Sequence, residues 1–224
     1  MDASHSSLEY DITQWVFSNP TPAWNQFIRQ KSCELFPTCL AKHTADDHCR
    51  ADLAFQLRTW ADLRNPAPGQ PTGMQIPQIK CQVDCLTARI LQLEAELHRP
   101  VCVFVSSDNT AISEEVTHFI NQIPNARAVF NRIAGNKTLS HSAEVLVGER
   151  YNYNFKVDML KDHPEFVDWM LISEAASAIH SFQSTFSRTA RERAGIIRSL
   201  HDIYLKDAPA GGPPCLCEAA FPNH

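Results

Sequence analysis

Glycine, positive charge and long apolar runs are all scarce in this sequence, and each scarcity excludes a class of protein. Only 7 of the 224 residues are Gly, and the Gly-x-Ser-x-Gly turn of an α/β-hydrolase is absent. Lys and Arg number 20 against 25 Asp and Glu, so no cationic excess can neutralise a nucleic-acid backbone. No stretch approaches the roughly 20 apolar residues of a membrane span. We therefore expect neither a nucleic-acid partner nor a membrane span within this sequence.

The N-terminal residues also lack the basic region and apolar core of a signal peptide. We expect either a cytoplasmic protein or a piece of a longer chain whose lost N-terminal anchor places it in the Golgi or secretory lumen. The eight cysteines bear on this choice, because disulfides persist in that lumen and free thiols in the cytosol.

No Cys-x-x-Cys pair is present, so neither a zinc ribbon nor a redox motif is supported. Several metal-ligand types nevertheless lie close together in the N-terminal part: Cys33, Cys39, His43, His48 and Cys49. Their spacing matches no standard zinc site, and a metal site, disulfides and free thiols all stay open as alternatives.

Strand-like and helix-like segments alternate along the chain. Apolar residues at 53, 55 and 57 alternate with other residues, which predicts a strand over 52–59. The run VCVFV at 101–105 is typical of a parallel strand buried on both faces. An apolar stripe at helical spacing predicts a helix over 80–98. The remaining expectations are a helix from Thr21-Pro22, irregular structure over 32–50, a loop over 64–77, a helix over 111–122, a strand over 128–133, an amphipathic helix from Pro164, a strand over 178–182 and a helix from Ser184.

This alternation predicts an α/β fold, with a Rossmann-like, largely parallel sheet and flanking helices. Ligands of such sheets bind outside the carboxyl ends of the strands. The rule selects three places in this sequence, at 58–59, 107–109 and 183–185.

Each of these places has a ligand-binding reading and a structural alternative. Arg58 could hold a phosphate bidentately or be a surface residue that ends a strand, and Gln56 shares its face. Ser184 and Thr185 could bind an anion at a helix start or serve as an N-cap.

The two acidic candidates carry the same kind of ambiguity. Asp108, followed by Asn109, could accept from a ribose hydroxyl or a base N–H, or could cap the following helix. Asp168 by itself is typical of the solvated face of an amphipathic helix.

Three segments, in order within residues 15–196, resemble the nucleotide-binding half of the GDP-fucose-dependent fucosyltransferases. This superfamily spans α1,2-, α1,6- and protein O-fucosyltransferases and the plant xyloglucan enzymes. The first segment, LAFQLRT at 53–59, is similar to a strand ending in His-x-Arg or, in the plant branch, Gln-x-Arg. The second, VFVSSDN at 103–109, is similar to a strand ending in an acidic turn. The third joins DWMLIS at 168–173 to HSFQSTFS at 180–187, similar to a closing motif with a Ser/Thr-Phe phosphate turn.

The resemblance implies the C-terminal, donor half of a GT-B glycosyltransferase that moves fucose from GDP-fucose to a glycan or glycoprotein acceptor. The reaction would invert configuration and would need no metal or other cofactor. Arg58 would be the catalytic residue, because it would contact the β-phosphate and stabilise the leaving GDP. The donor-binding residues implied are Gln56 and Arg58 on the first strand, Asp108 and Asp168 at the guanosine, and Ser184 and Thr185 at the phosphates.

The chain departs from the family pattern in two respects. Thr59 and Trp60 follow Arg58 where many members have a second Arg and an Asp, and little sequence precedes residue 50 to form an acceptor domain. We therefore expect an N-terminal helical and loop segment over 1–50, a remnant of an acceptor domain, followed by a nucleotide-sugar-binding domain over 51–200 and a flexible tail over 201–224. The alternative function is a non-catalytic nucleotide-binding or interaction domain on the same fold, a degenerate or truncated paralogue.

Overall fold

The computed structural model describes residues 22–37, 39, 49–57, 72–131, 164–181, 186, 189–190, 203–207 and 215–219. The helices are α2 (Pro22–Leu35), α4 (Pro77–Leu97), α5 (Thr110–Ile120) and α8 (Pro164–Glu174), with a short 3-10 helix, η1 (Gly73–Gln75). The strands are β1 (Leu53–Leu57), β2 (Val101–Ser107), β3 (Ala126–Phe130), β4 (Ser177–Ser181), β5 (Ile203–Asp207) and β6 (Cys215–Ala219).

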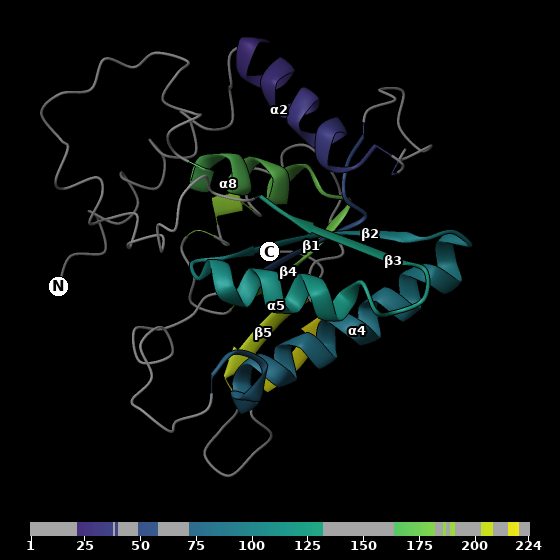
Figure 1. Cartoon of the computed structure of the whole chain (residues 1–224), viewed down its shortest axis with the longest axis vertical. Helices are drawn as coiled ribbons and strands as arrows, with labels where there is room; N and C mark the ends of the chain where they lie inside the picture. The colour runs from purple at the N-terminus through teal and green to yellow at the C-terminus, as the bar shows by residue number, and fades with distance from the viewer. Residues whose placement is uncertain are drawn as a thin grey trace, which may run out of the picture.

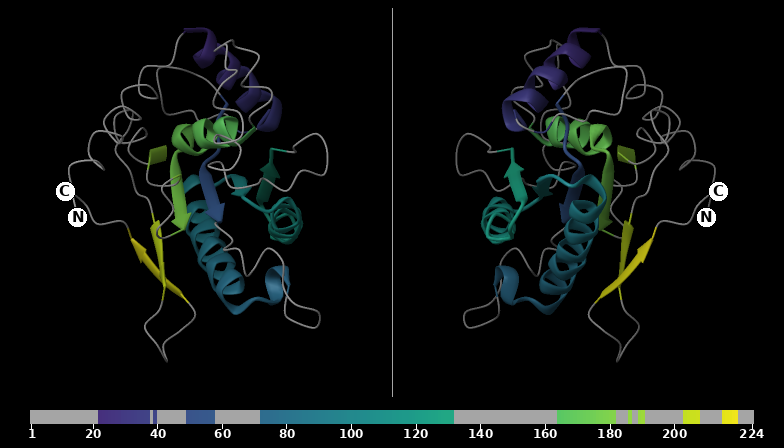
Figure 2. Two further views of the ribbon diagram at one scale, coloured as in Figure 1. Left: turned by 90° about the vertical axis from the view of Figure 1, so that its left-hand side faces the viewer. Right: turned by 90° about the vertical axis from the view of Figure 1, so that its right-hand side faces the viewer.

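These strands form one twisted sheet in the order β3-β2-β1-β4-β5-β6 (Figure 1). All neighbouring pairs are parallel except β5 and β6, which are antiparallel. Helices α2 and α8 lie on one side of the sheet, and α4 and α5 lie on the other (Figures 1 and 2). The prediction of an α/β, Rossmann-like parallel sheet with flanking helices is confirmed.

The sheet reaches further toward the C-terminus than the sequence pattern predicts. Strands β5 and β6 both fall within 201–224, so the prediction of a flexible tail is wrong for 203–207 and 215–219. The Gly residues and three of the four Pro residues of 201–224 fall in 208–214, between the two strands, and Pro222 follows β6. Ladder hydrogen bonds to neighbouring strands, which no local pattern encodes, hold these segments in the sheet.

Both faces of the central strands are buried, as the apolar run at 101–105 predicts. Every residue of β1 and β2 is buried. In β1 the side chains of Leu53, Phe55 and Leu57 pack into a core formed with α4 and α5. Ala54 lies in a second core, formed with α2 and α8. The alternation read from the sequence therefore divides one strand between two cores.

Helix α8 is buried on all of its sides, which corrects the expectation of an amphipathic helix with a solvated face. Residues 167–173 are all buried, and they include Asp168 and Ser173. The sheet covers one side of the helix, and α2 lies on the opposite side (Figure 2). The indole Nε1 of Trp169 donates to Thr189 Oγ1 at 2.9 Å, which ties the helix to a further segment. A helix covered in this way shows no polar stripe in its sequence.

Disulfides fasten the N-terminal segment to the sheet. Helix α2 continues to Leu35, so the first four residues of the stretch expected to be irregular are helical. Cys33 is bonded to Cys49, just before β1, and Cys39 is bonded to Cys102 in β2. These cysteines are therefore not thiolate ligands of a metal. Cys81 and Cys85 in α4 are also disulfide-bonded, so no cysteine whose side chain the structure describes is free.

The side chain and the backbone carbonyl of Asp52, the residue before β1, join three strands at the amino edge of the sheet. Both oxygens of Asp52 accept from the guanidinium of Arg99, at 2.6 and 2.8 Å, and Oδ2 also accepts from the backbone N–H of Cys102 at 2.9 Å. The carbonyl of Asp52 accepts from the backbone N–H and the hydroxyl of Ser177, both at 3.1 Å. The hydrogen bond to Asp52 raises the pKa of Arg99 above its ordinary value, so the cation persists at all ordinary pH values.

Backbone groups on the outer edge of β3 form hydrogen bonds with residues close to them in the sequence. The side-chain amide of Asn121 accepts from the N–H of Ala128 at 2.9 Å and donates to its carbonyl at 3.0 Å. The N–H of Ala126 donates to the carbonyl of Ile123, and the Arg127 guanidinium donates to the carbonyl of Ala126. The backbone groups of Ala126 and Ala128 that could pair with another strand are thus already engaged.

None of the helices in the described ranges has the length and apolar character needed to cross a bilayer.

Replacing Asp52 by Asn is expected to lower the free energy of unfolding by about 2 kcal/mol, since Arg99 then loses its charged partner in a partly buried place. Denaturant unfolding followed by circular dichroism measures this loss. The matched control is Asp84→Asn in α4, whose exposed ion pair with Lys80 should contribute about 0.5 kcal/mol or less. Equal losses in the two variants would contradict a structural role for Asp52.

Replacing both Cys39 and Cys102 by Ala should lower the free energy of unfolding more than replacing both Cys33 and Cys49. The first bond spans 63 residues and the second 16, so the chain-entropy model gives losses of about 4 and 3 kcal/mol. Chemical unfolding of the two double variants under non-reducing conditions compares them. The reverse order would show that loop closure is not the main contribution.

Candidate functional site

Three polar side chains form a row across the central strands, near their carboxyl ends. In the parallel register Gln56 of β1 lies opposite Ser106 of β2 and His180 of β4. Their exposed fractions are 4%, 5% and 1%, so all three are buried. Each stands two positions beyond a small or apolar residue of the core under α8, namely Ala54, Phe104 and Ala178, and so faces that helix.

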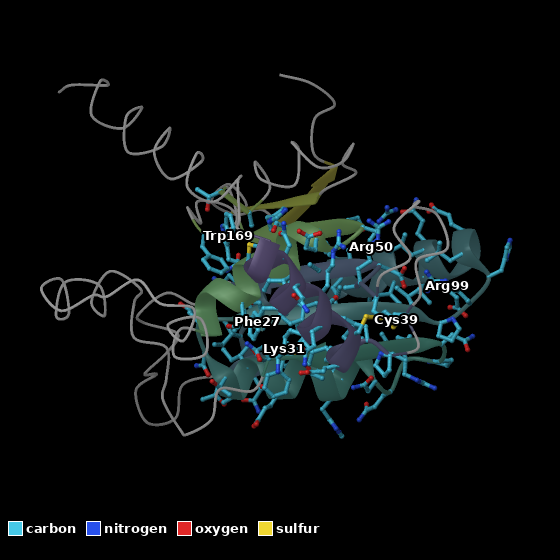
Figure 3. All side chains as sticks on the ribbon, turned by 90° about the horizontal axis from the view of Figure 1, so that it is seen from above. Phe27, Lys31, Cys39, Arg50, Arg99 and Trp169 are labelled. Atoms are coloured by element: carbon cyan, nitrogen blue, oxygen red, sulfur yellow. A yellow bond between two sulfur atoms is a disulfide. The ribbon has the colours of Figure 1, made fainter. Side chains whose placement is uncertain are left out.

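The row is joined to α8 through a buried hydrogen bond. The hydroxyl of Ser106 donates to Oδ2 of Asp168 at 2.8 Å, and both residues are less than a tenth exposed. The structure therefore brings together two residues that the sequence predicts for the donor site, Gln56 through its register with Ser106 and Asp168 through its bond to Ser106. Figure 3, which looks down on α2, shows the neighbouring Trp169 and the amino-edge Arg99 on opposite sides of that helix.

The turn after β2 shows which of Asp108 and Asn109 caps the following helix. The side chain of Asn109 accepts from the N–H groups of Ala111 and Ile112, at 3.0 and 3.4 Å, and is the N-cap of α5. Its own N–H donates to the hydroxyl of Ser107 at 3.2 Å. Asp108 is not the cap, and it stands half-buried at the carboxyl end of β2.

Arg58, Ser184 and Thr185 lie outside the described residues. The strands that precede them are placed, however. Arg58 directly follows Leu57 at the end of β1, and positions 184–185 come three residues after the end of β4. Since β1 and β4 are adjacent and parallel, the two strands end at the same edge of the sheet. Their roles stay predictions.

Sequence reasoning missed Ser106 and His180 as members of the row. Both were visible as polar residues inside apolar strands, each in line with the core face of its strand. A search for polar residues at the last position that faces α8 finds them together with Gln56 only when the strands end at 57, 107 and 181, as the structure has them. Nothing local to Asp168 reveals its partner, which is 62 positions away.

Comparison with known proteins gives limited information. No protein-family model matches the chain, and no curated protein matches it. Among solved structures, the chain is similar to a mutant of Arabidopsis thaliana FUT1 in complex with GDP, with 14% sequence identity and a TM-score of 0.43. The similarity covers 86% of this chain and 35% of that chain, so the chain spans about a third of the length of the protein it matches. A likeness this distant says nothing about function, and the fold is established by the strand order and register.

Asn109→Ala should lower the free energy of unfolding by about 1 kcal/mol, because two N–H groups at the start of α5 lose their acceptor. Thermal or denaturant unfolding measures the change. Asn109→Asp is the control, since its carboxylate can accept the same hydrogen bonds and should retain most of the stability. A variant pair with equal stability would show that the cap contributes nothing.

Proposed function

We propose that this chain is a fucosyltransferase-like glycosyltransferase, or its donor-binding half, and that it binds GDP-fucose at the carboxyl edge of β1, β2 and β4. One observation carries the proposal. The described parts of the three segments that resemble the family lie on β1, on β2 and its following turn, and on α8 and the end of β4, with Gln56 in register with Ser106 and His180. Segments far apart in the sequence thus reach one edge of one sheet, where such sheets bind ligands.

In the proposed reaction GDP is the leaving group, and it is bound at this edge of the sheet. When the bond between fucose and the β-phosphate oxygen breaks, its electron pair remains on GDP and negative charge grows there. Arg58, directly after β1, would stabilise that charge, and Ser184 and Thr185 would donate to the phosphates beside it. Asp108 and Asp168 would accept hydrogen bonds from the guanosine. The acceptor would be a glycan or glycoprotein.

The disulfides support the secretory lumen over the cytoplasm as the site of action. Six cysteines, in α2, before β1, in β2 and in α4, are disulfide-bonded. Disulfides of this number are rare in reducing compartments and common in the secretory pathway. We propose that residues 51–200 form the donor-binding unit. The disulfides Cys33–Cys49 and Cys39–Cys102 fasten the N-terminal segment to it.

Calorimetric titration tests the proposal directly. The oxidised protein should bind GDP selectively over ADP and UDP. Arg58→Ala should weaken GDP binding about 30- to 100-fold, because hydrogen bonds to charged phosphates are among the stronger polar contacts. Arg127→Ala on β3 is the matched control, since Arg127 is exposed and its guanidinium donates to the carbonyl of the neighbouring Ala126.

The outcomes separate the two functional classes. Unchanged GDP affinity in Arg58→Ala would contradict the assignment of the donor phosphate site. Selective GDP binding without release of GDP from GDP-fucose, with or without glycan acceptors, would instead identify a non-catalytic nucleotide-binding domain.

A further inference from the structure

We propose that Ser106 is a positioning residue of the donor site and that it acts through Asp168. The proposal rests on the proposed function and extends it to a residue that does not itself contact the nucleotide. It starts from the 2.8 Å hydrogen bond between the Ser106 hydroxyl and Oδ2 of Asp168, which crosses from the sheet to α8 in a buried place.

The first step concerns the orientation of α8. Most of the buried surface of this helix is apolar and includes Val167, Met170, Leu171 and Ile172. Apolar contacts are non-directional, so they favour burial without fixing one rotation of the helix on the sheet. The bond from Ser106 is directional, and it accordingly fixes which side of α8 faces the carboxyl ends of the strands.

The second step concerns the oxygens of Asp168. The side chain is 7% exposed, so water no longer supplies most of its hydrogen bonds and donors within the protein have to replace them. The hydroxyl of Ser106 is such a donor, and it holds Oδ2 in one direction relative to the sheet.

The third step links the same bond to the phosphate side of the site. Helix α8 ends at Glu174, and only Ala175 and Ala176 separate it from β4. The N–H of Ala176 donates to the carbonyl of Ala51 at 2.9 Å, so this short connection is held at the sheet. A shift of α8 is therefore passed to β4, which leads into the predicted phosphate-binding residues Ser184 and Thr185.

The experiment compares variants at position 106 that differ in the hydroxyl alone. Ser106→Thr keeps the hydroxyl, and Ser106→Val replaces it by a methyl group at nearly the same volume, so any strain from the added bulk is common to both. Calorimetric titration with GDP should show affinity close to wild type for Ser106→Thr and about tenfold weaker for Ser106→Val. Ser106→Ala should resemble Ser106→Val.

A second background shows whether Asp168 mediates the effect. In Asp168→Ala, the difference in GDP affinity between Ser106→Thr and Ser106→Val should disappear, because position 168 then has no side-chain acceptor for the hydroxyl. Ser177→Ala is the matched control, since it removes a buried hydroxyl of the same sheet at the opposite edge, where Ser177 donates to the carbonyl of Asp52. It should lower the unfolding midpoint and leave GDP affinity unchanged.

The possible results are distinct. Equal GDP affinity of the Thr and Val variants would overturn the positioning role while leaving the donor site intact. A Thr–Val difference that persists in Asp168→Ala would overturn the path through Asp168. Absence of GDP binding by the wild-type protein would instead overturn the proposed function, and with it this extension.

Discussion

The register of the three central strands depends on Asp52. Its side chain holds Arg99 and the backbone of β2, while its carbonyl holds the first residue of β4. Because strands are stiff over a few residues, a register fixed at the amino edge is carried to the carboxyl edge. A slip of one residue there would turn Ser106, Gln56 or His180 to the opposite face. The polar row therefore depends on an ion pair at the other end of the sheet.

The two faces of the sheet are stabilised in different ways. The face under α4 and α5 is filled by large aliphatic side chains, while the face under α2 and α8 contains several alanines and the polar row. Small side chains bury less apolar area and contribute less to folding. This is the face to which the disulfide from Cys39 to Cys102 attaches the N-terminal segment. This disulfide thus stabilises the face of the sheet whose core contains the polar row.

The periodicity of apolar residues predicts those elements whose buried face follows from the helix or strand repeat alone. The stripe of α4 and the apolar run of β2 predicted both elements, and alternation in β1 predicted its two faces. What failed depended on distant partners. Asp168 has no local sign of burial because α2, the sheet and Thr189 cover its helix from three places in the sequence, and β5 and β6 are strands because of their neighbours. The structure brings Gln56 and Asp168 together, and the donor-binding roles of these two residues and of Arg58, Asp108, Ser184 and Thr185 all stay predictions.

The side-chain amide of Asn121 affects whether molecules of this protein associate through β3 at high concentration. A strand from another molecule would have to displace this amide from both backbone groups of Ala128. The amide is tethered within the same chain, so it competes at a local concentration far above that of any dissolved neighbour. The tethered amide therefore outcompetes a strand of another molecule at Ala128, which disfavours association of molecules through β3. A partner that binds at Ala128 has to contact side chains rather than these backbone groups.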